Sequence, residues 1–304
     1  MKCIPIEQLN NAAKIPAQLV ADGEKVYAQQ IENAARSIFE RRSERPVVLI
    51  SGPSGSGKTT SAHRIAALLE SYGCKAHTIS MDNYFLPMHE NEAARDENGN
   101  IDFESPLRLD IPLFKKHLEM LFKGEQIDIP AFDFAKQERI VGMPLQRNSG
   151  EIVILEGIHA LNPLVTGNSE DFTTCVYVSV RTRISDGEKL LHPSKIRLMR
   201  RLMRDKLFRG RSITETFEFF KSVERGENLY IMPFKNRADF DIDTFIEYEP
   251  LVYRDILLPE LAAESPHYAD YGDYEDIEYF LKLLEPVERG IVPENSLIKE
   301  FIGN

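Results

Sequence analysis

Eight residues near the start of the chain have the types and the spacing of a phosphate-binding loop. Residues 52–59 read Gly-Pro-Ser-Gly-Ser-Gly-Lys-Thr, which matches the pattern G-x-x-x-x-G-K-[ST]. Glycines let successive backbone N–H groups turn inward toward an anion, whose approach a Cβ atom would obstruct. The lysine adds a mobile positive charge for the β- and γ-phosphates, and the threonine hydroxyl can bind Mg²⁺. The pattern therefore predicts binding of a nucleoside triphosphate with magnesium.

The segments on either side of this loop support the prediction. Residues 47–50 are a short apolar run typical of a buried parallel strand, and residues 58–72 have apolar residues at helical spacing until Gly73. A helix that begins at Lys58 would point its positive end at the same anion. We assign nucleotide binding to Gly52, Ser54, Gly55, Ser56, Gly57, Lys58, Thr59 and Thr60. Lys58 is also a catalytic candidate, and Thr59 a metal ligand.

Two large classes of nucleotide-binding protein are disfavoured by what surrounds the loop. The chain has no Asn-Lys-x-Asp segment of the kind with which GTPases read guanine. Motor ATPases usually end the magnesium-binding strand in Asp-Glu, whereas this strand ends Leu155-Glu156-Gly157. The class that is left, kinases of small molecules, should show acceptor residues and a cationic lid.

Two carboxylates are candidates for the acceptor side. Asp82 comes just after a strand expected at 76–79, and ligands of an open α/β sheet gather at the carboxyl ends of its strands. Its carboxylate could accept a proton from an acceptor hydroxyl, or bind magnesium through water. Glu104 stands beside Phe103, and the pair could hold two sugar hydroxyls and a base. Each carboxylate could instead only cap a helix or turn, so both alternatives stay open.

A basic run supplies the expected lid. From Lys195 to Arg211, eight of seventeen residues are Lys or Arg and only Asp205 is acidic. Four of the arginines fall at spacings of three and four: Arg197, Arg200, Arg201 and Arg204. They should therefore share one helix face and repel one another, a repulsion that a bound polyphosphate would relieve. Ser212 with Glu215 forms a capping-box pattern, which predicts a helix–loop–helix lid over about 195–225. A solvated helix face or a nucleic-acid contact are the other uses of such a run.

The remaining elements predict an α/β fold with a doubly wound parallel sheet. Further strands are expected at 151–155, 173–180 and 240–248, alternating with helices. Short β-prone pieces indicate an inserted β-hairpin at about 124–143. Residues 1–45 should form a helical extension, with apolar residues at helical spacing from Glu24 to Arg42, and residues 46–304 the main domain, with a C-terminal helical segment at about 249–304.

The composition limits the cell compartment and the binding partners that we expect for the protein. The 304 residues carry 37 basic and 48 acidic side chains, a net charge of −11, which argues against a nucleic-acid partner. Three cysteines form no close pair, as expected in a reducing compartment. No apolar stretch approaches 18 residues and no signal peptide is evident, so we expect a cytoplasmic protein that does not contact a membrane. Assembly into a homo-oligomer stays open.

Taken together, these motifs resemble the uridine kinase and phosphoribulokinase family of P-loop kinases, most of all its bacterial uridine kinase-type members. The likeness runs from about Val47 to Asp239. It implies ATP and Mg²⁺ as cofactors, a catalytic Asp82 in the segment Asp82-Asn83-Tyr84-Phe85, and a magnesium ligand at Glu156. In the lid it matches Arg200, Arg201, Arg204, Asp205, Arg209, Gly210 and Arg211, which makes Arg201 and Arg204 catalytic candidates and Arg209 and Arg211 ATP ligands.

The same resemblance implies the acceptor contacts. Phe103-Glu104-Ser105-Pro106 and Phe132-Asp133-Phe134 match two further family segments, with Glu104 in place of the ribose-binding aspartate. The implied substrate contacts are Tyr84, Phe103, Glu104, Phe132, Gln137 and Arg139, and the implied metal ligands are Thr59, Glu156 and Asp82.

Three residues depart from the family pattern, and all of them face the acceptor. Gln137 stands where uridine-cytidine kinases have a histidine, Phe132 replaces a tyrosine, and Glu104 replaces an aspartate. We expect phosphoryl transfer to the 5′-hydroxyl of a uridine- or cytidine-like ribonucleoside. A kinase of a sugar phosphate or vitamin alcohol, or a nucleotide-binding regulatory module, are the alternatives.

Overall fold

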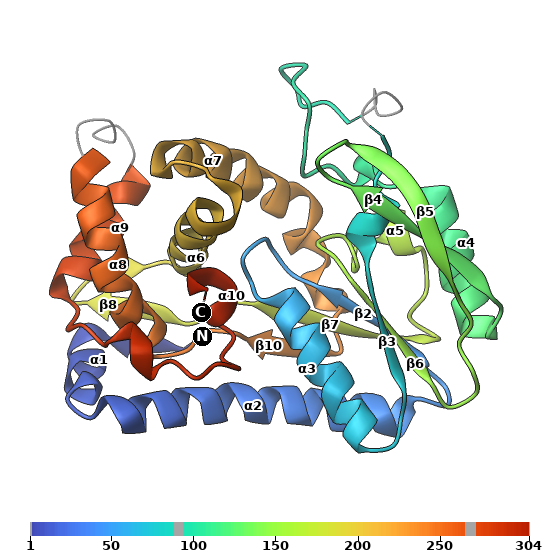
Figure 1. The fold of residues 1–304 in the computed structure, drawn as a ribbon, viewed down its shortest axis with the longest axis horizontal. Coiled ribbons are helices and arrows are strands. Elements are labelled where there is room, and N and C mark those ends of the chain that lie inside the picture. The colour runs from blue at the N-terminus through green and yellow to red at the C-terminus, as the bar shows by residue number, and fades with distance from the viewer. Residues whose placement is uncertain (1, 88–93, 265–271, 304) are drawn as a thin grey trace.

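Five strands form the parallel sheet at the centre of the molecule (Figure 1). The computed structural model describes residues 2–87, 94–264 and 272–303. In spatial order the strands are β10 (Phe240–Asp243), β7 (Thr173–Ser179), β2 (Val47–Ser51), β6 (Ile152–Glu156) and β3 (Ala76–Ser80). Side chains of β2 alternate between two apolar cores, as the two-residue period of a strand requires. The sheet is thus covered on both faces, and the predicted doubly wound α/β fold is confirmed.

Each face of the sheet has its own set of helices. One core contains side chains of the 3₁₀ turn η1 (Met81–Tyr84), α4 (Ile111–Lys123) and α5 (Pro163–Thr166). The other core contains side chains of α2 (Pro16–Arg41), α3 (Lys58–Ser71), α6 (Pro193–Arg209), α7 (Ile213–Tyr230), α8 (Glu249–Glu264) and α9 (Gly272–Leu283). Because all five strands run parallel, the loops after β2, β3 and β6 meet at one edge of the sheet.

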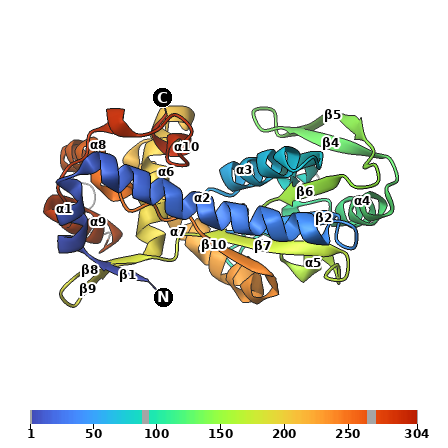
Figure 2. The ribbon, with the colours of Figure 1, turned by 90° about the horizontal axis from the view of Figure 1, so that it is seen from below.

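The N-terminal segment is part of the main core. β1 (Cys3–Pro5) pairs with β8 (Arg183–Asp186), which pairs with β9 (Lys189–Leu191), and α1 (Ile6–Ala13) follows β1. The helix that the sequence indicates from Glu24 is α2, and it begins eight residues earlier, with Pro16 at its first position. Figure 2 shows α2 lying along the molecule beneath the sheet. Its buried face consists of Leu19, Val20, Gly23, Tyr27, Ile31, Ala34, Ala35 and Ile38.

The inserted hairpin and the two lid helices are present as predicted. β4 (Ile127–Asp133) pairs antiparallel with β5 (Glu138–Leu145). α6 ends at Gly210, and Ser212 and Glu215 form the expected capping box at the start of α7. Shorter elements are η3 (Pro106–Arg108), η4 (Met232–Arg237), η6 (Arg289–Ile291) and α10 (Lys299–Ile302). Residues 265–271 of the expected C-terminal segment lie outside the described residues. Within the described part of the chain, no helix combines the length and the hydropathy that crossing a membrane would need.

Candidate active site

The phosphate-binding loop connects β2 to α3 and has the backbone shape that its glycines predict. Gly52 has φ of 153°, and a Cβ atom there would lie 1.8 Å from the carbonyl oxygen of Val178. Gly57 precedes α3, and no side chain caps the positive end of this helix. The hydroxyl of Ser56 is buried without a hydrogen-bond partner in the described chain. An uncapped helix end beside an unpaired hydroxyl fits a bound phosphate.

Side chains from α6 and from the segment after β10 hold this loop from outside. Arg197 donates from Nη1 to the carbonyl oxygen of Ser54 at 3.1 Å, and Arg200 donates to that of Gly55 at 3.1 Å. Thr244 donates to the carbonyl oxygen of Ser56 at 2.7 Å. Three consecutive carbonyl groups are therefore bound from outside, which keeps the loop in one shape before a ligand arrives.

Three oxygen-bearing side chains meet beside the loop and could bind a divalent cation. The Thr59 hydroxyl lies 3.3 Å from Oε1 of the buried Glu156, at the end of β6. Asp82 is close enough to Glu156 for the two charges to interact. The described residues contain no group of three or more Asp, Glu, His or Cys arranged to hold a metal. The donors Thr59, Glu156 and Asp82 nevertheless fit Mg²⁺, which keeps several waters and binds proteins through one or two carboxylates plus phosphate oxygens.

A cavity of about 440 Å³ opens next to the loop and brings together residues from six parts of the chain. Ser54 belongs to the loop, Asp82 to η1, and Glu104 to the segment before η3. The cationic wall comes from the lid. The lining residues are Ser54, Asp82, Phe85, Phe103, Glu104, Phe134, Gln137, Ile158, Arg201, Arg209, Arg211 and Phe219. Sequence reasoning named eight of these twelve, and the four that it missed are apolar: Phe85, Phe134, Ile158 and Phe219.

Aromatic rings make the far wall of the cavity. Phe85 and Phe134 meet edge to face with their centroids 5.9 Å apart. Gln137 has φ of 56° in the hairpin turn, and its Nε2 donates to the carbonyl oxygen of Phe134 at 2.8 Å. One of the two N–H groups of the Gln137 amide is used inside the turn, which leaves the other N–H to donate to a ligand and the amide oxygen to accept from one.

The two carboxylates of the cavity have raised pKa values. Burial, followed by the charge of Glu156, raises the pKa of Asp82 to about 6. Burial raises the pKa of Glu104 to about 7, although Arg201 and Lys58 oppose the change. The side chain of Asp82 is exposed, and it lines the cavity. Such pKa values suit groups that accept protons or hydrogen bonds near neutral pH.

The position of Glu104 is set by residues that sequence reasoning did not assign to the site. Asp102 is buried; its Oδ1 accepts from the backbone N–H of Glu104 at 3.1 Å, and its Oδ2 accepts from Arg225 and from the hydroxyl of Tyr230. A Cβ atom at Gly226 would lie 2.2 Å from that of Glu104. The C-terminal end of α7 therefore holds the segment Asp102–Glu104 in place. No short sequence motif reveals this contact, because Asp102 and Arg225 are 123 residues apart.

The arginines of the lid are compensated, which corrects the expectation of one repelling helix face. Asp205 is fully buried and lies within 3.6 Å of four guanidinium groups, those of Arg201, Arg204, Arg209 and Arg211. Arg200 is also fully buried and pairs with Glu249, while Arg197 pairs with Glu227. Even so, Nε of Arg201 is buried without a hydrogen-bond partner among the described residues.

Apart from loop residues 52 and 55–58 and the metal candidates Thr59 and Glu156, five predicted site residues do not line the cavity. Tyr84 is fully buried in the second core, and its hydroxyl lies 3.0 Å from Nδ1 of His117, so it supports the fold where a substrate contact was expected. Arg139 binds Asp110 at 2.9 Å. Thr60 donates to Glu300, Phe132 packs behind Phe85, and Arg204 is turned toward Asp205.

Comparison with known proteins places the chain in a family. The model of the family described as "Phosphoribulokinase / Uridine kinase family" matches residues 47–248. The chain belongs to this family. The resemblance and the expected class of enzyme, a phosphotransferase with an alcohol acceptor, are thus confirmed. The family implies the use of ATP.

Curated relatives match a similar length of the chain. A uridine kinase from Lactobacillus helveticus (strain DPC 4571) is 31% identical over 198 residues, 64% of this chain and 85% of the relative. A uridine kinase from Halobacterium salinarum is 27% identical over 198 residues, 64% of this chain and 77% of the relative.

Solved structures are similar at a lower level. A possible uridine kinase from Bacillus stearothermophilus superimposes with a TM-score of 0.48 and 18% identity, over 71% of this chain and 98% of that one. A phosphoribulokinase from Rhodobacter spheroides superimposes with a TM-score of 0.47 and 13% identity, over 66% and 70%. At these values the superpositions carry no argument about function.

Proposed function

We propose that this protein transfers the γ-phosphoryl group of ATP to the 5′-hydroxyl of a ribonucleoside, uridine or cytidine, with Mg²⁺ as the metal. One observation carries the proposal: a single cavity joins Ser54 of the phosphate-binding loop to Asp82, Glu104 and an aromatic wall. A triphosphate held by the loop would end beside the two carboxylates, where an alcohol can reach its last phosphorus atom.

Each side of the cavity has a part in the proposed reaction. Asp82 orients the acceptor hydroxyl and takes its proton as the new oxygen–phosphorus bond forms and the bond to ADP breaks. Glu104 accepts hydrogen bonds from the two ribose hydroxyls, and the phenylalanines pack on the base. Arg201 and Arg209 face the charge on the transferred group. Mg²⁺ held by Thr59 and Glu156, with Asp82 nearby, would neutralise phosphate charge.

ATP consumption with a panel of alcohols tests this proposal. Purified protein with ATP and Mg²⁺ is given uridine, cytidine, adenosine, a pentose phosphate or pantothenate, and ADP is measured against a sample without acceptor. We expect ADP formation that depends on uridine or cytidine, and the 5′-monophosphate as product. ADP that forms only with the pentose phosphate or pantothenate would replace the nucleoside as the acceptor. No acceptor-dependent ADP at all would leave the regulatory-module alternative.

Omitting the metal tests the cofactor in the same assay. With excess EDTA the rate should fall to the background level, because phosphate charge is then left without its cation. Turnover that persists in EDTA would contradict the proposed role of Thr59 and Glu156.

A further inference from the structure

A second cavity, of about 520 Å³, also adjoins the phosphate-binding loop. Consecutive loop residues separate the two: Pro53 lines the second cavity and Ser54 lines the first. Arg197 lines the second cavity, and Arg201, one turn further along α6, lines the acceptor cavity. Nothing in the proposed phosphoryl transfer uses the second cavity.

The walls of the second cavity carry a net positive charge. Its lining contains the cations Arg181, Arg183, Arg197 and Lys235 and the anions Glu227 and Asp241, four against two. Burial and the neighbouring cations lower the pKa of His192, which therefore adds no charge at pH 7. The excess of two positive charges stands out in a chain whose net charge is −11.

Two of the four cations have their own carboxylate and two do not. Arg181 pairs with Asp241 at 2.6 Å, and Arg197 pairs with Glu227. In the described part of the chain, neither Arg183 nor Lys235 has an ion-pair partner, and Nη1 of Arg183 is buried with no hydrogen bond. A buried guanidinium N–H without a partner is costly, and a bound anion would remove that cost.

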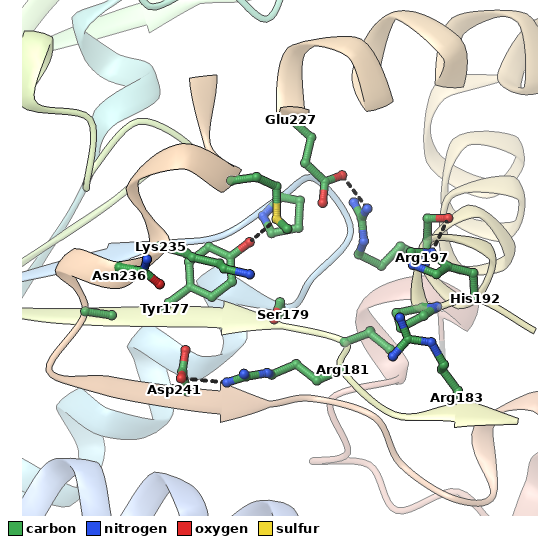
Figure 3. Close-up of a pocket in the computed structure, with 16 residues that line it drawn as sticks. Tyr177, Ser179, Arg181, Arg183, His192, Arg197, Glu227, Lys235, Asn236 and Asp241 are labelled. Carbon is green, nitrogen blue, oxygen red and sulfur yellow. Dashed lines mark hydrogen bonds and ion pairs between the residues drawn. The ribbon is translucent and has the colours of Figure 1, made fainter. Parts of the chain in front are cut away.

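Between the charged groups the cavity offers an apolar surface. Figure 3 shows Lys235 and Asn236 on one side of the cavity and Arg183 and His192 on the other, with Tyr177 and Ser179 of β7 forming the floor. Met232 and Val180 extend this floor. A ligand that spans the cavity can place carbon atoms on the floor and negative charge at the sides.

We propose that the second cavity binds a small organic dianion, a phosphate monoester or a dicarboxylate, as an effector of the enzyme. The ligand would touch Pro53 of the phosphate-binding loop. It would also lie beside Arg197, whose Nη1 holds the carbonyl oxygen of Ser54 at 3.1 Å. Binding in the second cavity is therefore coupled to the shape of the loop, and by thermodynamic linkage nucleotide and effector change each other's affinity.

Titration of the nucleotide-loaded protein tests the site. The full chain is saturated with Mg²⁺ and a non-hydrolysable ATP analogue, so that the first phosphate site is filled, and with uridine, which fills the acceptor cavity. Glycerol 3-phosphate, glutarate and uncharged glycerol are then titrated by calorimetry at fixed ionic strength. We expect one molecule of at least one dianion to bind with a Kd below about 1 mM, no binding of glycerol, and an analogue affinity that shifts several-fold.

Charge-removing variants locate the binding. Arg183→Gln should weaken the dianion about tenfold or more, the usual effect of losing a charged hydrogen bond. Lys235→Gln should weaken it several-fold, because Lys235 is exposed. Arg36→Gln removes the same charge from an exposed position on α2 and should leave the affinity unchanged.

Three results would overturn the proposal. They are no dianion binding to the loaded protein, an equal effect of Arg36→Gln and Arg183→Gln, and no change of analogue affinity. Dianion binding that uridine displaces would also count against it, since the second cavity would then belong to the acceptor site. Failure of the analogue to bind counts against the proposed kinase activity alone, because the Arg183 dependence can be measured equally well without nucleotide.

Discussion

Asp82 is the side chain on which the proposed chemistry depends most directly. It lines the cavity beside Glu104, and its raised pKa keeps it able to take a proton near neutral pH. Asp82→Asn keeps the shape and removes the base, so kcat should fall by about 10²–10⁴-fold. Affinity for the ATP analogue should change less than about threefold, as measured by calorimetry.

The matched control is Asp22→Asn, the same change at an exposed position of α2. This control should leave both kcat and the affinity for the ATP analogue unchanged. A variant at position 82 with normal kcat and weakened ATP binding would refute the assignment of the base.

If Glu104 binds the ribose as proposed, nucleoside binding should depend on pH. Its folded pKa of about 7 lies above the ordinary value of 4.5, so the carboxylate that accepts bonds from ribose hydroxyls is present above pH 7 and is lost as the pH falls. The Kd for uridine, measured without nucleotide between pH 5.5 and 8.5, should rise about tenfold for each pH unit below 7. In Glu104→Gln this slope should vanish. A wild-type Kd that is constant down to pH 5.5 would show that Glu104 does not bind the sugar as a carboxylate.

At the scale of elements, the lid helix α6 presents arginines that differ in where they point. Arg201 lines the cavity and contacts Ser54, whereas Arg204 is turned toward Asp205 and does not line it. Arg201→Lys should therefore lower kcat by about 10²-fold with a smaller change in KM, because a lysine lacks the planar fork of donors. Arg204→Lys should cost less than about tenfold. The reverse order, from initial rates of both variants, would restore the catalytic role that the motif gives to Arg204 beside Arg201.

Local patterns predicted the elements well and the partners of their side chains poorly. The apolar runs at 47–50 and 151–155 are β2 and β6, and the hairpin follows from its short β-prone pieces. Motif spacing also placed Asp82, Glu104 and Arg201 in one cavity. It misplaced Tyr84, because a motif shows which residues are close in sequence and not which way the turn η1 aims them. The buried pairs were beyond its reach, since Arg200 and Glu249 are 49 residues apart.

For the whole molecule, the buried pair of Arg200 and Glu249 joins the lid helix to α8. Both side chains are fully buried, and two hydrogen bonds at 2.8 and 2.9 Å connect them. Arg200→Met leaves the buried carboxylate of Glu249 without a cation and should lower the free energy of unfolding by about 3–5 kcal/mol. Urea denaturation measures the effect.

Two comparisons sharpen that measurement. Lys206→Met, on the same helix, breaks an exposed pair with Glu260 and should cost less than about 1 kcal/mol. Arg200→Met combined with Glu249→Leu should recover much of the loss, because no unpaired charge is left. If the double variant is as unstable as the sum of its single changes, the pair is not coupled as the geometry indicates.

The N-terminal helix α2 makes the family-matched region depend on residues outside it. Residues 1–46 lie outside the matched range, yet Tyr27 of α2 is buried and its hydroxyl lies 2.8 Å from that of Ser61 on α3. Removing residues 1–45 would expose the apolar surface that α2 covers. Residues 46–304 alone should aggregate or unfold without a cooperative transition, as followed by circular dichroism. A soluble fragment with full turnover would show that α2 is dispensable.

The contact between Gly57 and Leu297 has a consequence for biosynthesis. A Cβ atom on Gly57 would lie 2.6 Å from Cδ1 of Leu297, and Thr60 and Glu300 are joined at 2.5 Å. The segment that packs on the start of α3 is thus made long after α3 itself. While residues near 300 are still inside the ribosome, the nascent chain carries an unfinished nucleotide site, so newly made protein should gain affinity for ATP only after this segment emerges.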